Sequence, residues 1–315
     1  MAMFAQAEPL DLTRQMWALI GRHTDKSFDW DAFPGSRGFP ELERAQMRYI
    51  GAGGSPKADD PSTLKPGQFT LSLVYQPVGK YAACHSHEVV EHFLVLSGVL
   101  TVGWAWGDEV IEARLGAKDM VLNQIGRPHG FRNDGVEPVL MSISVGSGMP
   151  RPPVYVGHPR DTDAAAARRF GASPGETHLF DPHSGDPRQR EFARHIVRSA
   201  DRRPVWQAGF ARSVYIGEGG APPGHYRMDK IHLPKGVAVR GYDRPVEDVF
   251  FVLEGCITVG WDQAGRLVEE SLGPRDAIFN PAGRVHYFRN DGAADAEFMM
   301  LVGAAGAEDV QFSSA

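Results

Sequence analysis

Four side chains in the first half of the chain have the types and the spacing of a metal site. His85 and His87 are two residues apart, Glu91 follows them, and His129 lies further along the chain. Residues i and i+2 of a β-strand point to the same face, so the two histidines can meet at one point. Glu91 can return to that point on an antiparallel strand, and His129 can reach it from another strand of a closed barrel. Three imidazoles and one carboxylate suit Fe2+, Mn2+, Ni2+, Cu2+ or Zn2+, and an octahedral ion would keep two positions open for substrate, O2 or water.

The segment that contains Glu91 occurs twice in the chain. EHFLVLSGVLTVGW begins at Glu91, and DVFFVLEGCITVGW begins at Asp248, 157 residues later. The same offset relates FRNDG at 131–135 to FRNDG at 288–292. Further upstream, YIGAGG at 49–54 corresponds to YIGEGG at 215–220 with an offset of 166, which indicates nine extra residues in the first copy. The sequence therefore predicts a duplicated domain.

Both copies have the pattern of β-strands. Short runs of β-branched, aromatic and aliphatic residues alternate with Gly, Pro, Asn and Asp, and their spacing is typical of a sandwich or barrel. LSG followed by LTVGW indicates a hairpin. Helical patterns lie mainly outside the copies, in residues 11–22, 161–170 and 187–200.

The residues around the two histidines carry a family resemblance. The spacing G-x5-H-x-H-x3-E-x6-G, from Gly79 to Gly98, matches the first motif of the cupin family, and Gly126, His129 and Asn133 match the core of its second motif. The chain therefore resembles a bicupin, which implies an all-β fold of two tandem double-stranded β-helix (jelly-roll) barrels. Two family positions differ in copy one. Gln124 replaces a proline and Lys118 replaces a glycine; in copy two these positions are Pro281 and Arg275.

The resemblance implies a domain layout in four parts. We expect a helical N-terminal extension over 1–46, a metal-binding barrel over 47–149, a partly helical linker over 150–205 and a second barrel over 206–315. Cupin barrels commonly pair, so we expect a homo-oligomer, in which the N-terminal helix with Trp17 and Leu19 could cover a neighbouring barrel.

The second copy has other residues at the positions of the metal ligands. His85, His87, Glu91 and His129 correspond to Tyr242, Arg244, Asp248 and His286. An arginine cannot bind a metal ion, because its guanidinium keeps a fixed positive charge. We expect an Arg244–Asp248 pair to fill a metal-free barrel. An anion pocket and a second metal site are the alternatives.

Five further residues are candidates for the substrate pocket of the first copy. Strand alternation directs Phe93 and Val95 to the same side as Glu91, and Phe131 to the same side as His129. Asn123 could donate a hydrogen bond to a ligand, although Asn280 repeats it. Trp106 has no counterpart in the second copy. For each of them, a role in packing is the alternative.

The resemblance also implies a class of reaction. One metal in the first barrel beside a degenerate second barrel is similar to gentisate-type and quercetinase-type dioxygenases, of which the quercetinase type uses three histidines and a glutamate. Oxalate-decarboxylating bicupins generally hold metal in both barrels. Our leading hypothesis is an Fe2+- or Mn2+-dependent dioxygenase for a small aromatic or enolic substrate, in which Glu91 stays bound or acts as a base. A non-redox isomerase, lyase or decarboxylase and a non-catalytic small-molecule-binding protein are the alternatives. Zn2+, Ni2+ and Cu2+ are the other possible metals, and we expect no organic cofactor.

Composition excludes several other classes of protein. The chain has 33 basic and 39 acidic residues, a net charge of −6, whereas a general nucleic-acid-binding protein needs a basic face. No apolar run has the ~18–20 residues of a membrane span. The N-terminal sequence MAMFAQAEPLDLTRQ lacks the pattern of a secretory signal. The two cysteines, Cys84 and Cys256, form no metal-binding pair in the sequence. We therefore expect a cytoplasmic protein that acts on a small molecule and binds neither nucleic acid nor membrane.

Overall fold

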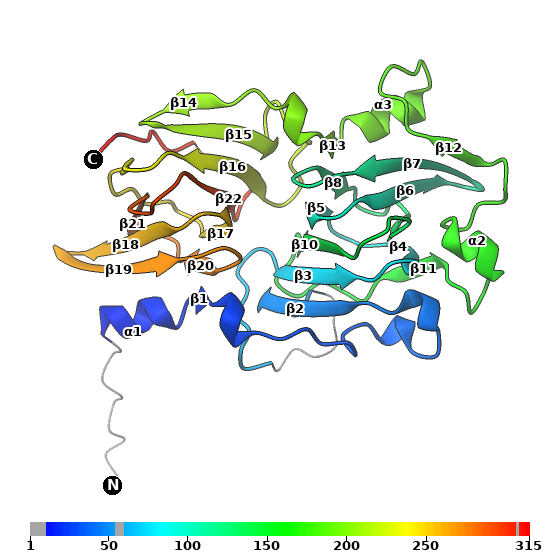
Figure 1. Ribbon diagram of the computed structural model, residues 1–315, viewed down its shortest axis with the longest axis horizontal. Helices are drawn as coiled ribbons and strands as arrows, with labels where there is room; N and C mark the ends of the chain where they lie inside the picture. The colour runs from blue at the N-terminus through cyan, green and yellow to red at the C-terminus, as the bar shows by residue number, and fades with distance from the viewer. Residues whose placement is uncertain (1–10, 54–59, 307–308) are drawn as a thin grey trace, which may run out of the picture.

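The computed structural model describes residues 11–53, 60–306 and 309–315. It shows two β-barrels side by side (Figure 1), each made of two sheets. The sequence prediction of an all-β fold with two tandem barrels is confirmed. The first ten residues of the predicted N-terminal extension, and residues 54–59 of the longer loop in copy one, lie outside the described residues. Within the described residues, none of the helices has the length and apolar character that crossing a membrane requires.

Barrel 1 has two six-stranded sheets. In spatial order, the first sheet contains β13 (Ile196–Val197), β8 (Met120–Asn123), β5 (Glu91–Ser97), β10 (Val139–Val145), β3 (Leu71–Gln76) and β2 (Ala45–Ile50). The second contains β11 (Val154–Gly157), β4 (Tyr81–Ser86), β9 (His129–Arg132), β6 (Leu100–Trp106), β7 (Glu109–Leu115) and β12 (Thr177–Leu179). The strands β11, β12 and β13 belong to the segment predicted as a linker, so this segment widens both sheets of barrel 1.

Barrel 2 has a seven-stranded and a three-stranded sheet. The larger sheet contains β1 (Ile20–Gly21), β20 (Ala277–Asn280), β17 (Asp248–Glu254), β22 (Ala296–Val302), β16 (Arg227–Leu233), β15 (Phe210–Ile216) and β14 (Val205–Gln207). The smaller contains β19 (Arg266–Leu272), β18 (Ile257–Gln263) and β21 (Val285–Arg289). The N-terminal strand β1 thus completes the barrel that the C-terminal part of the chain builds.

The hairpin predicted around Gly98 is wrong. β5 pairs with β8 and β10 in one sheet, whereas β6 pairs with β7 and β9 in the other. The chain therefore crosses from sheet to sheet at Gly98, which has φ +82° and no room for a side chain beside the Pro138 carbonyl. Alternation of apolar and polar residues predicts a strand but not the strand with which it pairs. The sequence therefore contained no indication of this crossing.

The helices are shorter than the sequence patterns predicted. The helices are α1 (Leu12–Trp17), α2 (Ala164–Arg168) and α3 (Pro187–Ala193), with 3-10 turns at η1 (His23–Asp25), η2 (Pro34–Ser36), η3 (Pro40–Leu42) and η4 (Ser199–Asp201). Each α-helix has an aspartate N-cap that accepts a backbone N–H. The first and third end early because strand pairing to β20 and β8 takes over the following residues.

Helix α1 packs against barrel 2 of its own chain. Leu12 and Met16 belong to the core cluster of that barrel, and the indole N–H of Trp17 donates to Glu270 on β19. The predicted contact of this helix with a neighbouring barrel is therefore made within one chain. From α1 the chain continues to β2 beneath barrel 1 (Figure 1), so the N-terminal segment contacts both barrels.

The two barrels share an apolar core between the sheet of barrel 1 that contains β2 and the seven-stranded sheet of barrel 2. Tyr49 of β2 packs edge-on against Phe251 of β17, with ring centroids 5.7 Å apart, within a cluster contributed by both barrels. Lys118, which replaces the family glycine, has φ 67° and forms ion pairs of 2.7 Å with Glu254 and Glu297 of barrel 2. A residue in a strained backbone conformation thus links the barrels.

Candidate metal centre

The four predicted ligands converge at one end of barrel 1. His85 lies on β4 and His129 opens the neighbouring strand β9, where the two residues are paired across the sheet. Glu91 opens β5 in the opposite sheet, and His87 lies on the connection between β4 and β5. The glutamate therefore faces the histidines across the barrel, and does not return on a strand paired with β4 as the sequence suggested.

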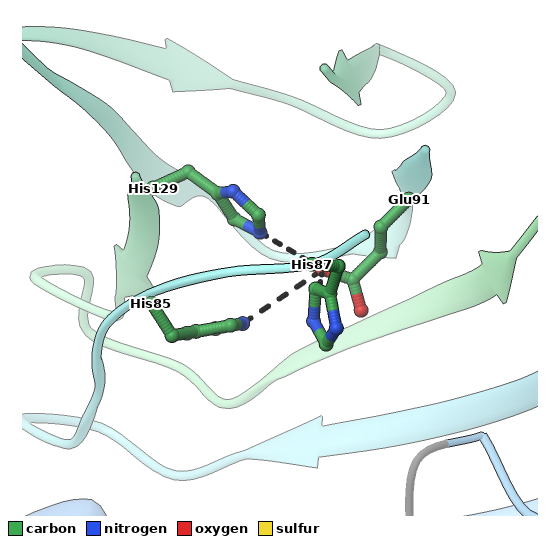
Figure 2. A group of neighbouring side chains, drawn as sticks. All are labelled: His85, His87, Glu91 and His129. Carbon is green, nitrogen blue, oxygen red and sulfur yellow. Dashed lines mark hydrogen bonds and ion pairs between the residues drawn. The ribbon is translucent and has the colours of Figure 1, made fainter. Parts of the chain in front are cut away.

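The three imidazoles surround one oxygen of the glutamate (Figure 2). The Nε2 atoms of His129, His87 and His85 lie 3.0, 3.5 and 3.9 Å from Oε2 of Glu91. All four side chains are buried, and their ligand atoms lie within 4.8 Å of one another. Two ligands of one ion with bonds of about 2.1 Å lie at most about 4.2 Å apart, so small side-chain shifts would close this set around a cation.

Backbone carbonyls fix the orientation of two of the imidazoles. Nδ1 of His85 lies 2.7 Å from the Ala83 carbonyl, and Nδ1 of His129 lies 2.7 Å from the Arg127 carbonyl. A carbonyl oxygen only accepts, so both Nδ1 atoms carry hydrogen and direct the lone pair of Nε2 into the site. The Nε2 lone pair of His129 then faces the Glu91 carboxylate at 3.0 Å, an arrangement that a metal ion bound by both groups would stabilise.

Burial and mutual contact control the charges of the four groups. Burial lowers the pKa of His85 to about 4, so this imidazole is neutral and able to bind a metal. Burial alone would raise the pKa of Glu91, but the surrounding imidazoles, His87 above all, hold this pKa well below its ordinary value. Burial also opposes a charge on His87, yet the nearby Glu91 outweighs it and raises the His87 pKa. The glutamate is therefore an ionised ligand.

A cavity of about 60 Å³ adjoins the four residues. Three of them, His85, His87 and Glu91, form part of its wall. The other lining residues are Ala32, Phe33, Pro34, Arg44, Gly53, Phe131, Ile143, Pro153 and Tyr155. At roughly 10–15 Å³ for each water-sized position, this space suits a molecule of only a few non-hydrogen atoms.

One of the five residues predicted for the pocket, Phe131, lines this cavity. Phe93 packs against Phe131 with ring centroids 4.9 Å apart, and Val95 lies with it in the core of barrel 1. Asn123 accepts a hydrogen bond of 2.8 Å from the indole N–H of Trp104. Trp106 lies beneath the Arg127 guanidinium, 4.5 Å from its ring centroid. These four are not among the described residues that line the cavity. For Phe93 and Val95, strand alternation selects the barrel interior and not its mouth.

Sequence reasoning missed Arg44 and Tyr155 in the cavity wall. Both lie outside the family motifs, on the segments that precede β2 and form β11, and Tyr155 is paired with His85 across the sheet. Comparison of the two sequence copies could have identified Arg44. The offset of 166 residues places it opposite Phe210, so an arginine stands in copy one where copy two has a core residue.

Comparison with known proteins agrees with this geometry. A cupin domain matches residues 72–146 and, a second time, residues 231–302. The chain is a bicupin. No curated protein matches this bicupin.

Solved structures share its fold at low sequence identity. An oxalate decarboxylase variant from Bacillus subtilis has a TM-score of 0.65 at 12% identity, over 93% of this chain and 79% of the other. The oxalate decarboxylase of Lactobacillus farciminis in complex with formate has a TM-score of 0.66 at 12% identity, over 93% and 88%. Mn(II) centres are described for the Bacillus subtilis enzyme. At this identity the similarity shows the fold alone.

The equivalent place in barrel 2 of the bicupin is filled by a buried ion pair. One oxygen of Asp248 accepts hydrogen bonds from Arg244 Nε at 2.9 Å and from the Tyr242 hydroxyl at 3.1 Å. His286 Nε2 lies 3.1 Å from the same oxygen. The guanidinium takes the place that an imidazole has in barrel 1, and its positive charge neutralises the carboxylate. Barrel 2 therefore has the Arg244–Asp248 pair that its sequence predicted.

Proposed function

We propose that this bicupin is a metal-dependent lyase of the decarboxylase class that acts on a small polar substrate in barrel 1. The observation that carries the proposal is the buried set of three imidazole nitrogens and one carboxylate beside a cavity of about 60 Å³. Four protein ligands leave two positions of an octahedral ion open, as catalytic sites require. The fold similarity to oxalate decarboxylases supports this class of chemistry.

The ligand set fits Mn2+ or Fe2+, and the Mn(II) centres of the Bacillus subtilis enzyme favour manganese. A bound divalent cation would supply Lewis acidity that stabilises negative charge developing on a substrate oxygen. In the net reaction a C–C bond breaks, CO2 leaves, and a proton takes its place on carbon.

The residues of the chain supply the surroundings for this reaction. His85, His87 and His129 hold their places from two strands and one connection, and the Ala83 and Arg127 carbonyls keep two of the imidazoles oriented. Among the described residues that line the cavity, Glu91 is the only carboxylate, and we assign proton exchange with the substrate to it. Phe33 and Phe131 contribute apolar surface to the wall of the cavity.

A dioxygenase is the second candidate, because the three-histidine, one-glutamate set is similar to that of quercetinase-type enzymes. The small cavity argues for the first candidate, since an aromatic ring with its oxygen substituents needs more space than about 60 Å³.

Metal content and gas exchange test the proposal together. Protein purified without chelator is analysed for metals by mass spectrometry, beside the His87→Ala variant. It is then incubated anaerobically with a panel of small mono- and dicarboxylates while CO2 release is followed. We expect about one equivalent of manganese, absent from the variant, and CO2 release without O2. O2 consumption with phenolic or enolic substrates would establish the dioxygenase instead, and tight ligand binding without turnover would establish a binding protein.

Homo-oligomer formation and the absence of an organic cofactor stay predictions. Light scattering coupled to gel filtration tests the first, and the absorption spectrum of the purified protein tests the second.

A further inference from the structure

A buried arginine faces the candidate metal centre from outside the ligand set. Arg44 precedes β2 and is 6% exposed, yet it lines the same cavity as His85, His87 and Glu91. Its guanidinium lies over the Phe33 ring at 4.0 Å from the centroid. The cation therefore packs against an aromatic ring that lines the same cavity.

The hydrogen bonds of Arg44 leave part of its guanidinium without a partner. Nη1 donates to the Ser36 hydroxyl and to the Leu42 carbonyl, both at 3.0 Å. Nε is buried and has no hydrogen-bond partner among the described residues. A buried N–H without an acceptor destabilises the protein unless a ligand supplies one. A group of this kind beside a cavity indicates a ligand with an oxygen acceptor.

The charges of the buried groups also indicate a ligand with acceptor oxygens, and one that is an anion. No carboxylate of the described residues forms an ion pair with Arg44, and burial lowers its pKa, partly offset by Tyr155 and Glu91. A divalent cation in the adjacent site would engage Glu91 as a ligand. The sum of +2 from the ion, −1 from Glu91 and +1 from Arg44 would leave +2 in a buried space. Buried charge is tolerated only when it is paired, so the occupant that completes this site is an anion.

The second barrel shows that the fold does not need this cation. Phe210 occupies the equivalent position and packs against Phe288, with ring centroids 5.5 Å apart. Arg44 lies in the same way over Phe131, the counterpart of Phe288, at 5.9 Å. Phe312 of the C-terminal segment adds a further ring at 5.2 Å from Phe210. The position is apolar and filled in barrel 2, whereas in barrel 1 it is cationic and adjoins a cavity.

We propose that Arg44 is the carboxylate-binding residue of barrel 1 and sets its substrate class. The substrate is a small carboxylate with a second oxygen function, such as a dicarboxylate or a 2-oxo or 2-hydroxy acid. One carboxylate binds to the guanidinium, and the second function reaches the metal ligands. This inference rests on the proposed function for the metal-bound end, but Arg44 itself is required only for recognition of the anion.

Titration calorimetry with a matched pair of ligands tests the assignment. Glycolate and its neutral amide, glycolamide, differ in the charge that Arg44 would recognise. Each is titrated into the Mn2+-loaded protein, whose metal content is measured in the same sample. We expect glycolate to bind at least about 10-fold more tightly than glycolamide, the preference given by a charge-assisted hydrogen bond.

Three variants separate recognition from folding. Arg44→Phe installs the residue of barrel 2, and Arg44→Lys keeps the charge but loses the planar fork. Arg48→Val is the control, because Arg48 is equally buried on β2, pairs with Asp29 at 2.8 Å outside the cavity, and corresponds to Val214. We expect Arg44→Phe to keep its manganese and to lose about 10- to 100-fold in glycolate affinity with little change for glycolamide. The glycolate affinity of Arg44→Lys should lie between those of the wild type and Arg44→Phe, and the affinity of Arg48→Val should match that of the wild type.

Unchanged glycolate affinity in a metal-loaded, folded Arg44→Phe protein overturns the assignment. If the wild type takes up no metal, the proposed function fails by itself. The same titrations on the metal-free protein then decide about Arg44, since glycolate must still bind the wild type more tightly than it binds Arg44→Phe. Equal affinities there would exclude Arg44 as the anion-binding group.

Discussion

The two barrels keep the same supporting hydrogen bonds and differ in what those bonds support. Trp104 donates to Asn123 at 2.8 Å in barrel 1, and Trp261 donates to Asn280 at 2.8 Å in barrel 2. Nδ1 of His129 lies 2.7 Å from a backbone carbonyl in barrel 1, and Nδ1 of His286 lies 2.7 Å from a backbone carbonyl in barrel 2. Around these constant contacts, barrel 1 has three imidazoles and a cavity, whereas barrel 2 has Tyr242 and Arg244 at the positions of His85 and His87.

The two barrels differ in how their buried charges are balanced. In barrel 2 the chain itself supplies the partner of the buried carboxylate, whereas we propose that in barrel 1 a bound metal ion and an anion do so. In barrel 2, Arg244 supplies the positive charge that Asp248 needs, so the interior is electrically satisfied without any addition. Among the described residues of barrel 1, Glu91 forms ion pairs with imidazoles, and Arg44 forms none with a carboxylate. A duplicated scaffold thus provides an internal control for every residue of the site.

The largest expected difference between the barrels concerns His129 and its counterpart in barrel 2, His286. His129→Ala removes a metal ligand, so metal content and activity should fall, with kcat/KM reduced at least about 10³-fold, equivalent to more than about 4 kcal/mol. His286→Ala should keep its metal content and its activity, because no group of metal ligands is found among the described residues of barrel 2. Metal analysis and steady-state kinetics of the two variants decide. Equal loss in both would show that the barrels share the function.

Next in size is the buried ion pair of barrel 2. Arg244→Met leaves the Asp248 carboxylate buried beside Tyr242 and His286 only, which should lower the free energy of unfolding by about 3 kcal/mol or more. Chemical unfolding followed by tryptophan fluorescence measures this change, and Arg244→Met combined with Asp248→Leu should recover much of it. A metal content that changes with Arg244→Met would contradict a purely structural role.

Loss of either Trp–Asn hydrogen bond should have a smaller effect on stability, of similar size in the two barrels. Asn123→Ala and Asn280→Ala each leave a buried indole N–H without an acceptor, so each should destabilise the protein by about 1–3 kcal/mol. We expect similar shifts of the melting temperature and an unchanged KM for both variants. A raised KM in Asn123→Ala alone would return this residue to the substrate pocket.

The smallest effect concerns Lys118 and Arg275, two residues at positive φ that occupy equivalent positions in the two barrels. Arg275 has φ 69°, and Arg275→Gly should stabilise the protein by about 1 kcal/mol through relief of backbone strain. Lys118→Gly relieves the same strain but loses the ion pairs with Glu254 and Glu297, so its net effect should be near zero. Differential scanning calorimetry compares the two, and an equal gain in both would show that the ion pairs between the barrels contribute nothing.

Motif spacing and duplication were sufficient to predict two barrels and the group of His85, His87, Glu91 and His129. This succeeds because a period of two residues decides which side chains of a strand share a face. The same reasoning misplaced the partner of β5 and directed Phe93 and Val95 to the pocket, since alternation does not say which strands pair or where the barrel is open.

The sequence by itself therefore determined the fold, the chemistry of the ligands and the loss of those ligands in the second copy. Only the tertiary structure decided that α1 covers barrel 2, that Tyr155 and Phe33 close the cavity, and that Arg44 stands beside the metal ligands. These residues come from segments before and after the barrel 1 motifs. No local period links them to His85, and their contacts exist only once the apolar faces of the strands have packed.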